Sequence, residues 1–311
     1  MSSRLLLPGL LAALGVALSL ALGRAAMRDA DGDAAAGTHA GAAAAHSGPI
    51  AAARVVCVGG ALTESVCALG AGATLVAVDD GSTFPPSVRD LPRLGYQRAL
   101  SAEGLLSQRP TLVLASPEAG PPAVLAQWRD AGIDVRVIDA EHTPAGAEAL
   151  ITAVAHALGR DAEGAALAAR LRADVARAQA SLAALLRAGR APPRVLCLYA
   201  RARGTLHACG EGSAMDAMVA LAGGVNALAG LHGSVPLGGE AAVAAAPDVI
   251  LMPRGSAELS GGSSAVLEEA SLALTPAGRA GRVVVMDDLL LSGFGPRTGQ
   301  ALEQLVRELH P

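Results

Sequence analysis

A tyrosine and an arginine in one loop are the residues of this chain best suited to bind a ligand. Tyr96 follows a glycine, and Arg98 lies two residues further along the chain. A loop at the edge of a sheet exposes such side chains to a ligand. A guanidinium close to a phenol oxygen favours the phenolate, which is a good ligand for ferric iron. The alternative interpretation is a loop tyrosine that covers apolar surface.

Carboxylates form a second group of candidates. Asp79 and Asp80 follow one apolar run, and Asp287 and Asp288 follow another. Glu64, Asp79 and Asp80 are the candidate residues of an alternative hypothesis, in which the chain is an α/β enzyme. Turnover by the metal-loaded protein would reveal such an activity. Adjacent residues on an extended strand point in opposite directions, so solvated loop acids are the preferred interpretation. The chain also lacks Gly-x-Ser-x-Gly, His-Glu-x-x-His and any lysine for a Walker motif, so we expect no enzymatic activity.

The elements that must position these residues occur twice in the sequence. Residues 103–114 and 240–251 each place a glutamate at the head of a short helix, seven residues before a proline that opens an apolar strand. Similar strands begin upstream, at Arg54 and Arg194. Two copies of one α/β lobe favour a ligand cleft between them.

The expected fold class is α/β, with two Rossmann-like lobes whose parallel central sheets are joined by a single long helix. In the first lobe, apolar runs alternate with helical segments, which is typical of a parallel sheet covered on both faces. These runs occupy residues 54–58, 75–78, 111–115 and 135–138.

The expected domain boundaries follow from these patterns. The N-terminal lobe covers 54–145, a helical connection covers 146–192, and the C-terminal lobe covers 193–311. Within the connection, residues 161–189 are strong helix formers, and a helix of about 28 residues spans roughly 42 Å. One stiff helix restricts hinge bending, so we expect ligand capture to move the lobes only slightly.

The N-terminus has the plan of an export signal. Residues 1–26 comprise a basic start, a long apolar run and a stretch of small residues, although the run is also long enough for a retained membrane anchor. The first cysteine is Cys57, so no lipid-attachment cysteine follows the signal, and we expect a periplasmic location. Residues 27–53 contain two histidines and no apolar periodicity, and are expected to form a flexible linker.

Composition limits the partners further. The 311-residue chain has a net charge of -4, a pI near 6.0 and no basic block, so nucleic acid is not expected as a partner. All 24 basic residues are arginine, so any anion contact must use a guanidinium.

No Cys-x-x-Cys motif occurs, and cysteines in apolar segments pack as small hydrophobic residues. Cys197 could nevertheless face Cys209 across a hairpin that turns near Arg203.

Several segments together resemble the periplasmic haem-binding proteins of haem ABC importers, the HmuT type. The Gly-Tyr-x-Arg segment points to haem, whereas the glutamate-helix-proline pattern is shared by the wider class of helix-linked binding proteins for haem, cobalamin and siderophores. The resemblance covers residues 54–310. Its segments are 59–64, 94–106 and 115–122 in the first lobe, and 220–226, 246–251, 274–279 and 293–297 in the second.

This resemblance implies that Tyr96 is the axial ligand of the iron of haem b, carried as the transported ligand, and that Arg98 supports its phenolate. It also implies that Glu103 and Glu240 dock on arginines of the permease, although both could equally cap their own helices, where the dipole favours an anion. The second lobe is expected to lack a counterpart of the Gly-Tyr-x-Arg segment.

The candidate residues on the far wall of the expected cleft allow more than one interpretation. His207 could be a second axial ligand or face a second haem, or could be a turn or packing histidine. Arg201 or Arg203 could pair with the haem propionates.

The resemblance further implies the partners of a monomeric binding protein. These are haem itself, an inner-membrane ABC permease with its ATPase, and an outer-membrane haem receptor system. A cobalamin-binding or ferric-siderophore-binding protein of the same class is the alternative, and competition in a haem titration would separate the cargoes.

Overall fold

The computed structural model describes residues 53–228 and 230–311. The expected signal peptide and nearly all of the expected linker lie outside these residues. No helix in the two described ranges is long and apolar enough to cross a membrane.

Lobe one is built on a four-stranded parallel sheet, with strand order β2-β1-β3-β4. Every residue of β1 is buried, and its side chains alternate between two clusters. Val56 and Val58 pack on the side of Trp128, whereas Val55 and Cys57 pack in the larger cluster that includes Ile151. The elements are β1 (Val55–Val58), α1 (Gly60–Ala68), η2 (Gly72–Thr74), β2 (Leu75–Val78), η3 (Pro86–Val88), α2 (Ala102–Leu106), β3 (Leu112–Ala115), α3 (Pro122–Asp130) and β4 (Asp134–Val137).

Lobe two has a mixed sheet, with strand order β10-β9-β5-β6-β8 and with β7 paired to β5. β10, β9, β5 and β7 run parallel, whereas β6 is antiparallel to both β5 and β8. The α/β class is therefore confirmed, but the expectation of a purely parallel second sheet is wrong. The cause is the tight turn after β5, where Gly204 adopts a φ of 75° and reverses the chain directly into β6.

The strands of lobe two are β5 (Arg194–Ala202), β6 (Thr205–Cys209), β7 (Val225–Asn226), β8 (Ser234–Pro236), β9 (Val249–Pro253) and β10 (Val283–Met286). Its helices are α6 (Ala214–Leu221), α7 (Gly239–Ala245), α8 (Arg254–Leu259), α9 (Ser263–Glu268), α10 (Ala270–Ala273), α11 (Pro276–Arg279), α12 (Asp288–Ser292) and α13 (Thr298–Leu309).

The cysteines at the β5–β6 hairpin are buried free thiols. Cys197 lies on β5 and Cys209 ends β6, as the hairpin interpretation requires, but no disulfide joins them. Burial raises the pKa of the Cys209 thiol to about 11. Both side chains therefore act as neutral apolar groups in the core.

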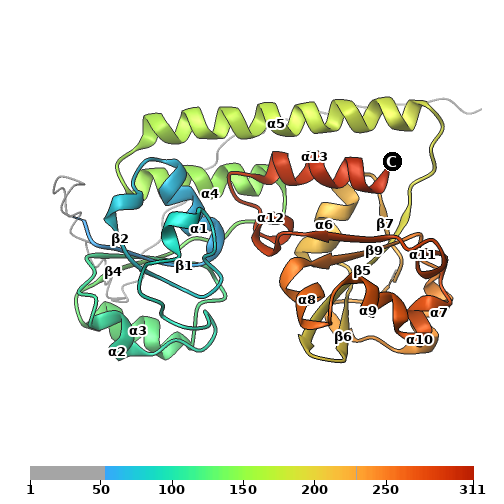
Figure 1. The fold of residues 1–311 in the computed structure, drawn as a ribbon. Helices are drawn as coiled ribbons and strands as arrows, with labels where there is room; N and C mark the ends of the chain where they lie inside the picture. Colours follow the sequence, from blue (N-terminus) through green and yellow to red (C-terminus); the bar gives the residue numbers. More distant parts are fainter. Residues whose placement is uncertain (1–52, 229) are drawn as a thin grey trace, which may run out of the picture. The chain divides into compact units, whose positions relative to one another are not determined.

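The lobes are connected through α4 (Pro144–Ala157) and the long helix α5 (Asp161–Arg187). Helix α5 packs against both α4 and α13 (Figure 1). The approach to α13 requires a glycine, because a Cβ at Gly299 would lie 2.8 Å from the amide nitrogen of Val175. The buried faces of these helices belong to one continuous cluster, in which Ile151, Leu171 and Leu305 are members from α4, α5 and α13.

Candidate functional site

Tyr96 lies at the start of a tight turn on lobe one, and its side chain is 58% exposed. The amide of Ala99 donates a hydrogen bond of 2.8 Å to the Tyr96 carbonyl and closes the turn. The preceding residue is held by the amide of Asp80, which donates to the Gly95 carbonyl at 3.0 Å. The backbone is therefore fixed, while the phenol ring remains accessible to a ligand.

Arg98 is exposed in the same turn. Among the described residues no hydrogen bond joins its guanidinium to Tyr96. Its role as a support for the phenolate stays a prediction.

Sequence reasoning missed a second tyrosine, Tyr199, near the end of β5. The chain has two tyrosines, and each is followed two residues later by an arginine. That repetition was the signal that could have found Tyr199. The expectation that lobe two lacks a counterpart is therefore wrong for the tyrosine and arginine, although no glycine precedes Tyr199.

Hydrogen-bond donors converge on the Tyr199 phenol from two directions. Nε of Arg201 donates to Oη at 2.9 Å, and Oγ of Ser234, on β8, donates to the same atom at 2.6 Å. The Arg201 guanidinium carbon lies 5.7 Å from the centre of the ring. We call Tyr199, Arg201, His207 and Ser234 the lobe-two tyrosine cluster.

His207 packs directly against this phenol from the neighbouring strand β6. Its ring centre lies 5.3 Å from that of Tyr199, with the planes 29° apart, and its Nδ1 is buried with no hydrogen-bond partner in the described chain. Arg203 is exposed at the hairpin turn. The structure thus gathers Arg201 and His207 around Tyr199, and leaves Arg203 outside the cluster.

Glu103 and Glu240 are exposed in the first turns of α2 and α7. One helical turn later, each helix exposes an aliphatic side chain, Leu106 at 39% and Val243 at 40%. Since residues three apart share a helix face, each helix presents an acid beside an apolar group.

Asp79 is not a solvated loop acid, and the preferred interpretation is wrong for this residue. It is 1% exposed and accepts hydrogen bonds from the amides of Gly59 and Gly81, both at 2.9 Å, and from Oγ of Ser82 at 2.6 Å. A buried carboxylate needs such partners, so Asp79 organises the loop after β2. Asp80 is exposed, as expected.

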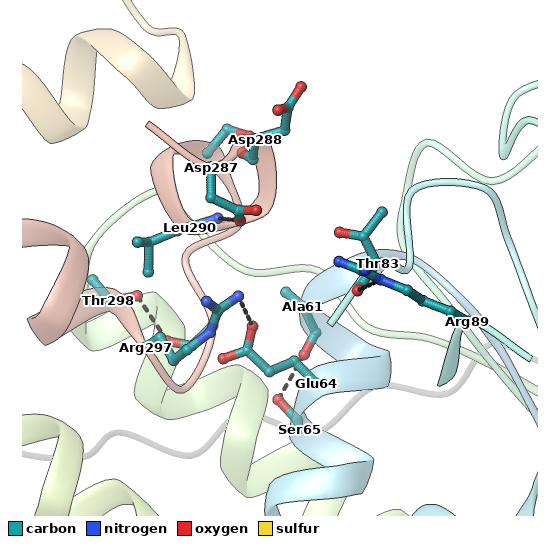
Figure 2. A network of polar contacts seen from close by, with 12 residues as sticks. Ala61, Glu64, Ser65, Thr83, Arg89, Asp287, Asp288, Leu290, Arg297 and Thr298 are labelled. Atoms are coloured by element: carbon teal, nitrogen blue, oxygen red, sulfur yellow. Dashed lines mark hydrogen bonds and ion pairs between the residues drawn. The ribbon is translucent and has the colours of Figure 1, made fainter. Parts of the chain in front are cut away.

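The other acids also have separate partners. Asp287 accepts from the amide of Leu290 at 2.9 Å and caps α12, while Asp288 is exposed. Glu64 is buried on α1 and pairs with Arg297, whose Nη2 lies 2.9 Å from its Oε2 (Figure 2). The acids that the enzyme hypothesis groups together are therefore not assembled into one site.

A cavity of about 340 Å³ lies beside the Glu64–Arg297 ion pair. Neither Tyr96 nor Tyr199 lines it. The lining residues are Glu64, Cys67, Ala68, Phe84, Pro85, Leu167, Arg170, Asp174, Pro296, Arg297 and Gln300.

The chain has two α/β lobes joined through one long helix, and each lobe has a tyrosine that is exposed or half-buried. This arrangement is that of a two-lobed binding protein. The chain belongs to the periplasmic binding protein family, whose family model, described as "Periplasmic binding protein", matches residues 55–290.

Solved structures of this kind align with most of the chain. The periplasmic haem-binding protein BhuT, in complex with two haems, is 44% identical, with a TM-score of 0.79 over 83% of this chain and 98% of its own. RhuT from Roseiflexus sp. RS-1, a periplasmic haem-binding protein in apo form, is 42% identical, with a TM-score of 0.78 over the same shares. A periplasmic haem-binding protein from Pseudomonas aeruginosa is 34% identical, with a TM-score of 0.77 over 83% of this chain and 92% of its own.

Curated relatives match a shorter segment. The vitamin B12-binding protein of Vibrio cholerae serotype O1 is 33% identical over 87 residues, which is 28% of this chain. The matched segment spans 32% of that relative's length.

Proposed function

We propose that this chain is the periplasmic substrate-binding component of a haem ABC importer, and that it carries haem without transforming it. The observation that carries the proposal is its pair of phenols, one on each lobe, in a chain that is 44% identical to a haem-binding protein over 98% of that protein. Tyrosine oxygen is a known axial ligand of haem iron.

Tyr96 is the proposed axial ligand of the first haem. Its ring is accessible, and its turn is fixed by backbone hydrogen bonds, so little ordering of the protein is needed when iron binds. The phenol proton leaves as the oxygen bonds to ferric iron. Arg98, in the same turn, supplies a positive charge that favours the phenolate.

The lobe-two tyrosine cluster is the proposed second iron site. Arg201 and Ser234 already donate to the Tyr199 oxygen, and both donors can remain when that oxygen carries the negative charge of a phenolate. The Arg201 guanidinium can also reach a propionate, since it is exposed. The relative solved with two haems supports a capacity of two.

Delivery requires export and docking. Residues 1–26 would direct the chain to the periplasm, where it would act as a monomer that receives haem from an outer-membrane receptor system. Glu103 and Glu240 would then dock on arginines of the inner-membrane permease, whose ATPase drives import. Their exposed positions on α2 and α7 support this assignment.

Matched phenylalanine variants test the ligand assignment. Titration of the native protein with ferric haem should give a high-spin tyrosinate spectrum and saturate at two equivalents. Tyr96→Phe and Tyr199→Phe should each remove one equivalent, and the double variant should lose the tyrosinate spectrum altogether, because the phenol oxygen is absent while the ring is kept.

The control for these variants must be an exposed side chain, which excludes Trp128 because it is fully buried in the core. His232→Phe is suitable, because His232 is exposed on lobe two and should leave both equivalents intact. If the double tyrosine variant bound haem with an unchanged spectrum, the tyrosinate assignment would be wrong.

Cobalamin is the second candidate cargo, because the curated relatives are vitamin B12-binding proteins. It is less favoured because those relatives match only 28% of the chain. Competition decides between the two: cobalamin or a ferric siderophore in excess should leave the haem titration unchanged, and displacement of haem would reassign the cargo.

A further inference from the structure

One contact links two motifs that the haem-site proposal leaves unexplained. Glu64 ends the 59–64 segment on lobe one, and Arg297 ends the 293–297 segment on lobe two. Their ion pair joins residues 233 positions apart in the chain. The side chain of Glu64 is 5% exposed and that of Arg297 is 17% exposed, so the pair is shielded from solvent.

Arg297 makes a second contact with lobe one. Its guanidinium carbon lies 3.6 Å from the centre of the Phe84 ring, which belongs to the loop after β2. The edge of the guanidinium therefore meets a carboxylate while its face covers an aromatic ring, and a planar fork is needed for both. Two elements of lobe one are fixed by a single side chain of lobe two.

The backbone of each lobe also lies close to the other lobe at this point. A Cβ at Gly60, at the start of α1, would lie 2.6 Å from Cδ1 of Leu289 in α12. A Cβ at Gly295 would lie 3.3 Å from the Cβ of Ala61. We call Glu64, Phe84, Arg297, Gly60 and Leu289 the lobe joint.

The ion pair is not arranged for maximal stability. Oε1 of Glu64 and Nε of Arg297 are both buried without a hydrogen-bond partner in the described part of the chain. A buried pair that is incompletely satisfied often contributes no more stability than well-packed apolar side chains of similar size. The ion pair then contributes to geometry rather than to stability, because it forms in one relative orientation of α1 and the segment before α13.

Hydrogen bonds lead from the joint to the loop that carries Tyr96. Oγ1 of Thr63, next to Glu64, lies 2.7 Å from Oγ of Ser82, and that hydroxyl donates to Asp79 at 2.6 Å. The next residue in the chain, Asp80, donates its amide to Gly95, which directly precedes Tyr96. Polar contacts therefore connect the joint to the turn that carries the proposed iron ligand.

We infer that Glu64 and Arg297 are positioning residues that hold the two lobes at one separation, and so set the spacing between the Tyr96 and Tyr199 sites. The inference on spacing rests on the proposed haem function, whereas the inference on lobe separation does not. The two can therefore fail independently.

Spin-label distances on the haem-free protein test the lobe separation. Labels at Ser107→Cys in lobe one and Ala244→Cys in lobe two occupy exposed positions, in a Cys67→Ser background because Cys67 is the half-buried cysteine of the four. The native joint should give one narrow distance distribution. Arg297→Ala should broaden it, while Arg307→Ala, which removes an exposed ion pair within α13, should not.

Arg297→Ala leaves a buried carboxylate without its partner and could unfold the protein. The double variant Glu64→Leu with Arg297→Leu avoids this, because apolar side chains can fill the same space. We expect its melting temperature to equal or exceed that of the native protein, yet its distance distribution to be broad. A narrow distribution in this stable variant would overturn the inference.

Haem dissociation tests the spacing separately. The double leucine variant should release haem about tenfold faster than the native protein, since changes in affinity appear mainly in the dissociation rate. A broad distribution with an unchanged dissociation rate would retain the lobe joint and reject its link to the haem site.

Discussion

At the scale of single residues, the two Tyr-x-Arg segments behave differently because their backbones differ. Tyr199 and Arg201 lie on a strand, where residues two apart share a face, so the guanidinium reaches the phenol. Tyr96 and Arg98 lie in a turn, where that spacing has no such consequence. The same three-residue pattern therefore yields a preassembled pair in lobe two and an open one in lobe one.

Arg201→Ala should weaken haem binding at the second site by about ten- to a hundredfold, since a charge-assisted hydrogen bond to the phenolate contributes roughly 1.5–3 kcal/mol. The expected readout is a lower affinity for the second equivalent, with a shifted tyrosinate band, in a haem titration. Arg279→Ala is the control, because Arg279 is exposed on α11, outside the cluster. An affinity for the second equivalent in Arg201→Ala that equals the native value would contradict the role of this contact.

Glu64 should make stability depend on pH. Burial raises the pKa of its carboxyl above the ordinary value of 4.5, although the adjacent Arg297 opposes the shift and Asp287 adds to it. The folded chain then holds this proton more tightly than the unfolded chain. The free energy of unfolding should therefore decrease as the pH rises from the ordinary value through the raised one.

The matched measurement is urea unfolding of the native protein and Glu64→Gln between about pH 4 and pH 8. The stability of the native protein relative to the variant should fall with increasing pH and then level off. Arg170 and Asp174, which line the same cavity, are present in both proteins and do not contribute to the difference. A difference that stays constant across the range would show that Glu64 does not titrate as described.

At the scale of elements, α2 and α7 occupy equivalent positions in the two copies of the repeat. Each exposes a glutamate and, one turn later, an aliphatic side chain, Leu106 or Val243. Such a pair suits a partner that presents a guanidinium beside an apolar surface, once in each half. The repeat therefore favours a partner with two equivalent halves, such as a dimeric permease.

Glu103→Gln with Glu240→Gln should reduce haem-dependent stimulation of the permease ATPase by more than tenfold, because both proposed ion pairs with the permease would be lost. Haem affinity should not change, since neither glutamate belongs to the proposed iron sites. Glu308→Gln, an exposed acid on α13, is the matched control. Undiminished stimulation in the double variant would reject these helices as the docking surface.

The same elements show how far the sequence can be interpreted. Apolar runs that alternate with helices predicted the strands of lobe one to within a residue or two, because each buried strand has a local signature. The hairpin near Arg203 that brings β5 and β6 together was considered only as a possible setting for a disulfide, whereas β8 was not predicted, since it is three residues long and pairs with β6 across an intervening helix. Tyr199 and Arg201 have a local signature, but Ser234 joins their cluster from 35 positions away and the lobe joint is formed across 233 positions, so residue types alone could not assemble either one in full.

At the scale of the whole chain, two constraints act on the relative motion of the lobes. Helix α5 packs against α13 of lobe two and against α4, which in turn packs on α1 of lobe one, so it is attached to both lobes. The lobe joint adds a second attachment, through the buried Glu64–Arg297 pair. Hinge closure needs a few residues free to absorb a large change in backbone angles, and a connection fixed along its length offers few.

Small-angle scattering of the haem-free and haem-bound protein should therefore give profiles that superimpose. The control is the double variant Glu64→Leu with Arg297→Leu, in which α5 alone restrains the lobes and a difference between the two states should become measurable. If the native protein instead contracted clearly on binding haem, the packing of α5 and the joint would not limit closure. Identical profiles in the native protein and a shift in the variant would assign the rigidity to the joint rather than to the helix.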